Sequence, residues 1–222
     1  MPLTRYQNVV QTTANSCGAF ALAAALAHSN PESLIDCLDV NLVATGYTLF
    51  TPAPFAQSLY QFTGNLSLNF INAQATYQYQ SPAQDMNAPS ALVNTAINFG
   101  VAANRIRVFY TTGGNTLFGA IAVTNNGAGA NLLATETTLL DEDNVIVNGP
   151  TPYALPVNPQ VHLLVVNHGT HWIALTHDQV YDPATGFVGP YAPAGTPVNT
   201  INYHHGGAMT SYALSGVCIQ FA

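Results

Sequence analysis

Three residue types near the two ends of this chain could together form a nucleophilic thiol site. Cys17 lies in the segment Gln-Thr-Thr-Ala-Asn-Ser-Cys-Gly, which begins at Gln11. Far downstream, His171 begins the segment His-Trp-Ile-Ala-Leu, and Asp182 lies in Tyr-Asp-Pro-Ala-Thr-Gly. A sulfur attacks a carbonyl group as the thiolate, which a positively charged partner or a helix N-terminus stabilises. The sequence therefore predicts that Cys17 is a nucleophile, with a histidine and an aspartate available to support it.

The residues that follow Cys17 predict a helix. Ala19 to Ala27 is an apolar run rich in alanine, the best helix former. Asn15 or Ser16 is placed to cap its start, and Asn30-Pro31 is placed to end it. The thiol of Cys17 is then expected in the first turn, at the positive end of the helix dipole.

Two donors near Cys17 are candidates to stabilise the negative oxygen that forms when a thiolate attacks a carbonyl. Gln11 lies on the approach to the helix and offers its side-chain amide, while the backbone N–H of Cys17 offers a second hydrogen bond. Gly18 leaves room beside the sulfur. We therefore predict an oxyanion-binding site made by Gln11 and Cys17.

The order of these motifs, Gln-x5-Cys-Gly, then His-Trp, then Asp-Pro-x-x-Gly, resembles that of the papain-like cysteine peptidase superfamily. Within it, the chain looks most like the bacteriocin-processing, double-glycine peptidase branch. The resemblance covers both ends of the chain and leaves residues 42–82 unmatched. It implies that Gln11 is an oxyanion donor, Cys17 the nucleophile, His171 the general base and Asp182 the residue that orients the base.

The short interval between His171 and Asp182 is compatible with a β-hairpin. Trp172 to Leu175 and Val180-Tyr181 predict two strands joined by a polar turn. In a hairpin whose loop has two or four residues, directly opposite residues have an odd sum of residue numbers and share a face. His171 and Asp182 also have an odd sum, so we expect them on one face, with Cβ atoms about 5 to 8 Å apart.

The cysteine count argues against a disulfide framework. The chain has three cysteines, an odd number, and no paired spacing. This pattern favours free thiols or a reducing compartment. Cys37 falls in a second helix-like stretch and Cys218 in a C-terminal strand, so we interpret both as structural thiols.

The histidines do not match a known metal-binding motif. Seven are present, with His168 and His171 three apart and His204-His205 near the end. There is no His-Glu-x-x-His or Cys-x-x-Cys pattern. Gly113-Gly114 predicts a turn rather than a phosphate-binding loop. We therefore expect neither a metal ion nor a cofactor.

The amino-acid composition limits the kinds of molecule that this protein can bind. Only 6% of the 222 residues are charged, only three residues are basic, and the formal net charge is -7. This charge strongly disfavours nucleic acid binding. No apolar run reaches membrane-spanning length. The expected partner is a protein or peptide substrate, and the sequence leaves the oligomeric state open.

The chain contains no lysine, and its three basic residues are Arg5, Arg105 and Arg107. One interpretation is a bacterial effector or toxin that acts inside a eukaryotic cell, where a lack of ubiquitin acceptors would prolong its life. The other is an extracellular or extremophile composition in which charge is generally low. We recognise no signal peptide, because the segment before Ala19 to Ala27 is polar. The expected location is therefore the cytoplasm or, by a leaderless export route, a host cell.

Hydrophobic periodicity predicts an α+β fold in a single domain, residues 1–222, and the resemblance implies that this domain is papain-like. A helical part, about residues 1–100, contains the nucleophile and packs on an antiparallel sheet formed by about residues 101–222. Val161 to Val166 is a continuous apolar run, which is typical of a buried central strand. The other expected elements are helices at Pro31 to Val43, Phe55 to Phe62 and Pro89 to Phe99, the last ended by Gly100, and strands at Arg105 to Tyr110 and Val217 to Phe221.

Together these features predict a thiol-dependent amide hydrolase. The main hypothesis is a cysteine peptidase with a triad of Cys17, His171 and Asp182 and with Gln11 as oxyanion donor. A glutamine deamidase, or a transglutaminase or acyltransferase effector, would use the same residues, because fold resemblance does not decide the reaction class. The alternative from a different class is a non-catalytic module that binds peptides.

Overall fold

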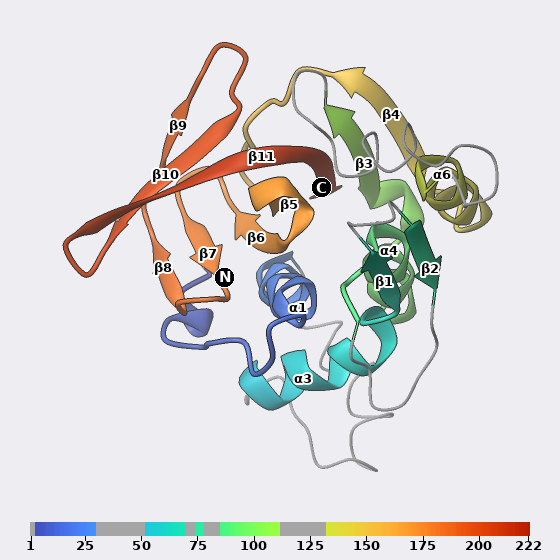
Figure 1. Ribbon diagram of the computed structural model, residues 1–222, viewed down its shortest axis with the longest axis horizontal. Helices are drawn as coiled ribbons and strands as arrows, with labels where there is room; N and C mark the ends of the chain where they lie inside the picture. The colour runs from blue at the N-terminus through green and yellow to red at the C-terminus, as the bar shows by residue number, and fades with distance from the viewer. Residues whose placement is uncertain (1–2, 30–51, 70–73, 78–84, 112–131) are drawn as a thin grey trace.

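The computed structural model describes residues 3–29, 52–69, 74–77, 85–111 and 132–222. Its centre is helix α1 (Cys17–Ser29), which lies between a large β-sheet on one side and helices α3 (Pro52–Thr63) and α4 (Pro89–Asn98) on the other (Figure 1). These helices confirm the three that were predicted within the described residues, and the fold is α+β. The predicted helix at Pro31 to Val43, which includes Cys37, lies outside the described residues.

Helix α1 is buried on every side. All residues from Cys17 to Ala27 are buried, and only His28 and Ser29 are partly exposed. A helix that is apolar all round needs cover on all its faces. Although α1 is apolar, it has only 13 residues, and no helix in the described parts of the chain is both long and apolar enough to cross a membrane. Its cover comes from α3, α4, the 3-10 turn η1 (Leu3–Tyr6), β5 (Val161–Val166) and β6 (His171–Leu175).

The large sheet has the strand order β4-β3-β11-β5-β6-β7-β8. The first half of β11 leaves this sheet and pairs with β10, which in turn pairs with β9, so these strands form an arm beside the body of the sheet (Figure 1). The remaining strands are β3 (Ile106–Thr111), β4 (Ile146–Thr151), β7 (Val180–Asp182), β8 (Phe187–Gly189), β9 (Ala192–Ala194), β10 (Thr200–His205), β11 (Ala208–Phe221) and a separate hairpin of β1 (Leu66–Asn69) and β2 (Gln74–Tyr77).

The prediction of an antiparallel sheet is wrong for one pair of strands. β3 and β4 run parallel, whereas the other pairings between described strands are antiparallel. The chain passes from β3 to β4 through a crossover that contains helix α6 (Leu132–Glu142). A crossover of this length is what a parallel pair requires. Helix α6 lies in the part of the chain predicted as the sheet part, and the β1–β2 hairpin lies in the part predicted as helical.

Strand β5 is buried because both faces of the sheet are covered. Val161, Leu163 and Val165 pack in the core around α1. Leu164 and Val166 pack in a second core on the other face, together with residues of β10 and β11. The strand pairs with β11 on one side and β6 on the other. The apolar run therefore forms the predicted buried central strand.

Helix α4 ends at the predicted glycine. Gly100 has a φ of 87°, the left-handed region that glycine adopts without strain. Its N–H donates to the carbonyl of Ile97 at 2.9 Å, and the N–H of Val101 donates to the carbonyl of Ala96 at 3.1 Å. These two bonds form a Schellman motif, which satisfies the last carbonyls of the helix.

A buried carboxylate from α6 binds the start of α4. Ala88 precedes the helix and offers no capping side chain. The buried Glu136 accepts hydrogen bonds from the N–H of Ser90 at 2.7 Å, from the Ser90 hydroxyl at 2.9 Å and from the Tyr77 hydroxyl. Burial raises the pKa of Glu136 above its usual range, although these donors oppose the shift. One side chain therefore joins α6, α4 and β2.

The substitution Glu136→Ala is expected to lower the free energy of unfolding by about 2 to 4 kcal/mol, because the buried N–H and hydroxyl of Ser90 lose this acceptor. Urea denaturation of the two proteins measures the difference. Glu142→Ala is the matched control, since Glu142 is an exposed residue of the same helix and its loss should cost less than about 0.5 kcal/mol. Equal unfolding midpoints for the two variants would contradict a structural role for Glu136.

Candidate active site

Cys17 is the first residue of α1, and its side chain is buried. The N–H of Phe20 donates to the carbonyl of Ser16 at 3.2 Å, so the helical hydrogen bonds begin at Ser16. The Ser16 hydroxyl does not cap the helix as predicted, because it turns back to the backbone N–H and carbonyl of Thr13 at 3.2 and 3.0 Å. Among the described residues, no acceptor bonds to the N–H of Cys17. That N–H is therefore free to bind an oxygen placed beside the sulfur.

Asn87 fixes the next residue of the helix. Its side-chain oxygen accepts the N–H of Gly18 at 2.9 Å, and its amide donates to the Thr63 hydroxyl at 2.7 Å. A Cβ atom on Gly18 would lie only 2.5 Å from the Cβ of Asn87. The glycine after the nucleophile thus allows Asn87 to approach the first turn. Sequence analysis missed Asn87, because no local pattern links it to Cys17.

His171 and Asp182 lie on the predicted hairpin. β6 and β7 pair antiparallel, with Leu175 opposite Val180, and the turn closes with a hydrogen bond from the N–H of Thr176 to the carbonyl of Gln179 at 2.8 Å. The loop between the strands therefore has the four residues 176–179. His171 and Asp182 are diagonal neighbours on one face, and Nε2 of His171 is 2.7 Å from Oδ1 of Asp182. This contact confirms the predicted geometry of the pair.

The imidazole of His171 also bonds to Cys17. Burial by itself lowers the pKa of His171, but the hydrogen bond to Asp182, the hydrogen bond to Cys17 and the charges of both partners outweigh it and raise the pKa to about 9. Because Nε2 is held by Asp182, Nδ1 is the ring nitrogen that remains for the thiol. The structure therefore brings Cys17, His171 and Asp182 together in one group, with His171 between the other two in its interactions.

Asp182 is a fully buried carboxylate surrounded by donors. Its Oδ1 accepts the N–H of Ala184 at 2.9 Å in addition to His171. Its Oδ2 accepts the hydroxyls of Tyr203, of Tyr212 at 2.9 Å and of Thr185 at 3.2 Å. Burial alone would raise the pKa of Asp182, but the hydrogen bond to His171, the charge of His171 and the hydrogen bonds from Tyr203 and from the N–H of Ala184 lower it to about 2. The carboxylate is therefore ionised at neutral pH.

Gln11 lies beside this group, but its amide is already in use. Its backbone N–H donates to the carbonyl of Pro183 at 2.8 Å, which ties the loop before α1 to the turn after β7. Its side-chain nitrogen donates to the carbonyls of Thr13 and Ala14 at 3.0 and 3.1 Å. Gln11 therefore becomes an oxyanion donor only if one of these bonds is exchanged, and its role stays a prediction.

Helix α3 supports the loop before Cys17. The buried Tyr60 donates its hydroxyl to the carbonyl of Asp85 at 2.8 Å, and it also bonds to the side chain of Thr13. Thr12 donates to the side chain of Gln57 one turn earlier on the same helix. Tyr60 thus joins the loop before the nucleophile to the loop that contains Asn87.

Cys218 and the two histidines of β10 lie outside the group of Cys17, His171 and Asp182. Cys218 is buried in the second core, where burial raises the pKa of its thiol, and it is a free thiol like Cys17. His204 and His205 are exposed on β10. Within the described segments, no three side chains of histidine, cysteine, aspartate or glutamate gather closely enough to hold a metal ion.

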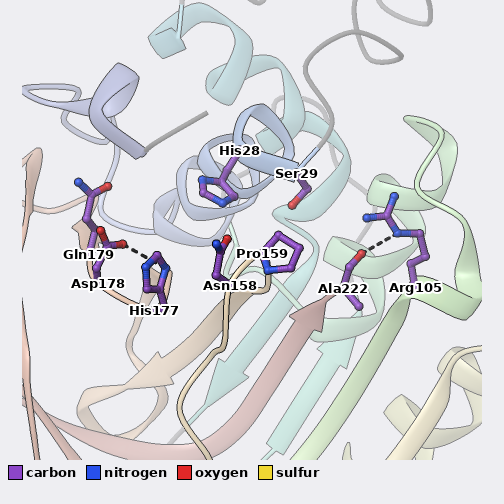
Figure 2. A pocket seen from close by; sticks show the side chains of 9 residues that line it. All are labelled: His28, Ser29, Arg105, Asn158, Pro159, His177, Asp178, Gln179 and Ala222. Atoms are coloured by element: carbon purple, nitrogen blue, oxygen red, sulfur yellow. Dashed lines mark hydrogen bonds and ion pairs between the residues drawn. The ribbon is translucent and has the colours of Figure 1, made fainter.

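A pocket of about 390 Å³ lies at the opposite end of α1 from Cys17 (Figure 2). His28 from α1, His177 and Gln179 from the β6–β7 turn, and Arg105 line it. The pocket contains no residue of the Cys17, His171 and Asp182 group. It is therefore separate from the thiol site.

Comparison of the chain with protein-family models, with curated proteins and with solved structures found no match. The case for a thiol site consequently rests on the residues and their geometry.

The substitution Gly18→Ala is expected to destabilise the protein by about 1 to 3 kcal/mol, because the added methyl group must displace Asn87 from the first turn of α1. It should also slow alkylation of Cys17 by iodoacetamide, since the sulfur moves with that turn. The double variant Gly18→Ala with Asn87→Gly makes room for the methyl group. Its loss of stability should be smaller than the sum of the two single losses, and an additive result would argue against a steric conflict at this point.

Proposed function

We propose that this protein is a thiol-dependent amide hydrolase, namely a cysteine peptidase with a papain-like arrangement of its site. The observation that supports this most is the position of one imidazole, since His171 bonds to both Cys17 and the buried carboxylate of Asp182. The sulfur also lies at a helix N-terminus, where a thiolate is stabilised. A cysteine that only filled space in the core would need neither neighbour.

In the first step, the thiolate of Cys17 attacks the carbonyl carbon of an amide, and a sulfur–carbon bond forms. The carbonyl oxygen becomes negative and is bound by the N–H of Cys17, with Gln11 as the proposed second donor. His171, as imidazolium, gives its proton to the leaving nitrogen, and the carbon–nitrogen bond breaks. The products of this step are a free amine and a thioester on Cys17.

In the second step, water hydrolyses the thioester. His171 is now neutral, so it accepts a proton from water as the water oxygen attacks the thioester carbon. The carbon–sulfur bond breaks, which releases a carboxylic acid and restores the pair of Cys17 and His171. Asp182 holds the imidazole in one orientation through both steps, and it stabilises the imidazolium without taking a proton.

The product formed from the amide distinguishes a peptidase from a deamidase or an acyltransferase that uses the same residues. Mass spectrometry of candidate protein substrates after incubation separates the outcomes. A cleaved backbone supports a peptidase. An intact backbone with a deamidated glutamine side chain indicates a deamidase, and a new amide to an added amine indicates acyl transfer.

The substitution Cys17→Ala is expected to abolish hydrolysis without unfolding the protein, with a loss of about 1,000-fold or more, because no other group replaces the sulfur. His171→Ala should have a comparable effect. Asp182→Asn should cost less, because an amide can still orient the imidazole. Rates of peptide cleavage and thermal unfolding of each variant measure these effects.

Cys218→Ala is the matched control, since Cys218 is the other described free cysteine and is also buried. It should retain full activity. A thiol-reactive probe gives a second test that needs no substrate: at neutral pH it should label Cys17 before Cys218, and His171→Ala should prevent the labelling. Retained hydrolysis in Cys17→Ala would exclude the proposed nucleophile.

Hydrolysis is expected to fall as pH rises through about 9, because His171 must be protonated to donate to the leaving nitrogen. The folded pKa lies above the ordinary 6.5, so the imidazolium also stabilises the fold fully below that pH, and this contribution is lost as pH rises through about 9. The dependence of kcat/KM on pH, together with a histidine NMR titration, measures both effects.

In Asp182→Asn the alkaline loss of activity should move to lower pH, because the carboxylate that stabilises the imidazolium is gone. If kcat/KM fell at the same alkaline pH in both proteins, the loss of activity would not be caused by deprotonation of His171 beside Asp182.

A further inference from the structure

Two tyrosines of the β10–β11 hairpin contact the carboxylate of Asp182. Tyr203 lies on β10 and Tyr212 on β11, and both donate their hydroxyls to Oδ2. In the hairpin, Ile201 is opposite Tyr212 and Thr210 is opposite Tyr203, so the two tyrosines are diagonal neighbours on one face. The hairpin thus reaches the candidate triad through two side chains.

The rings of these two tyrosines also pack against other side chains. Phe187 of β8 stacks on Tyr203 with 4.7 Å between ring centroids and 9° between planes. Tyr212 contacts the ring of His171 at 5.4 Å, so it touches two members of the triad. Tyr203 is 1% and Tyr212 9% exposed. Neither ring can turn its hydroxyl away from Asp182 without disturbing the second core.

The donors of Asp182 divide between its two oxygens. Oδ1 accepts from His171 and from the N–H of Ala184, while the two tyrosines and Thr185 donate to Oδ2. Rotation of the carboxylate would break the bonds on both oxygens together. A buried carboxylate also stays ionised only where donors replace the water it has lost.

We propose that Tyr203 and Tyr212 are positioning residues, which hold Asp182 ionised and aimed at His171. This inference rests on the proposed function, because it assigns the tyrosines to the same site. A purely structural role would predict that loss of either hydroxyl lowers stability but leaves the titration of Asp182 and the rate of the chemical step unchanged.

The variants Tyr203→Phe, Tyr212→Phe and the double variant remove hydroxyl groups and keep both rings. Tyr191→Phe is the matched control, since the hydroxyl of Tyr191 donates to the carbonyl of Thr176 at 3.0 Å and its ring packs against the same core. Carbon-13 NMR of the aspartate carboxyl groups follows the titration of Asp182, assigned with Asp182→Asn. Near-ultraviolet circular dichroism checks at each pH that the protein is folded.

The midpoint of the Asp182 titration is expected to rise from about 2 in the wild type by about one to two pH units for each hydroxyl removed, since a hydrogen bond to a charged group contributes that much. In the double variant kcat should fall about 10-fold or more with KM unchanged. Tyr191→Phe should change neither quantity.

An unchanged titration midpoint in the variants would overturn the inference, even if their stability fell. The single variants decide the question if the double variant does not fold. The titration needs no catalysis, so the two proposals fail separately. If the midpoint shifts but the protein has no hydrolase activity, the tyrosines still support Asp182 and the proposed function is wrong. If the protein is active but the midpoint does not shift, only this inference is wrong.

Discussion

Helix α1 has no charged side chain between Cys17 and Ala27, so it is stable only where apolar groups cover its whole surface. This requirement explains the layers around it: the sheet turns one apolar face to the helix, and α3 and α4 cover the rest. Complete burial also leaves the helix no room to shift, because protein interiors are close-packed. The first turn, and the sulfur of Cys17 with it, is therefore fixed relative to the strand that begins with His171.

On the other side of the sheet, the buried charge of Asp182 requires polar neighbours instead of apolar ones. An ion removed from water needs hydrogen bonds from protein groups, and here they come from β6, from the turn after β7, and from the β10–β11 hairpin. His171 connects the two regions, because it bonds both to Cys17 at the start of the buried helix and to the buried carboxylate of Asp182. The position of the imidazole therefore depends on the packing on both sides of the sheet.

The parts of this arrangement that depend on neighbours in the sequence were predictable, and the parts that depend on distant contacts were not. The pairing of His171 with Asp182 follows from strand parity across a short turn, and the end of α4 follows from Gly100, because both rules act within a few residues. Asn87 and Tyr203 approach the site from elements far away in the chain, and their own surroundings in the sequence are ordinary. The parallel pairing of β3 and β4 was missed for the same reason, since it depends on a crossover and not on the pattern of either strand.

The strand order has a consequence for how the protein folds. β11 lies inside the sheet between β3 and β5, although it follows every other described strand in the sequence. Pairings between segments far apart in the chain form slowly, because a long loop must close before they are made. The same strand supplies Tyr212, so the set of donors around Asp182 is complete only after these slow, long-range pairings have formed.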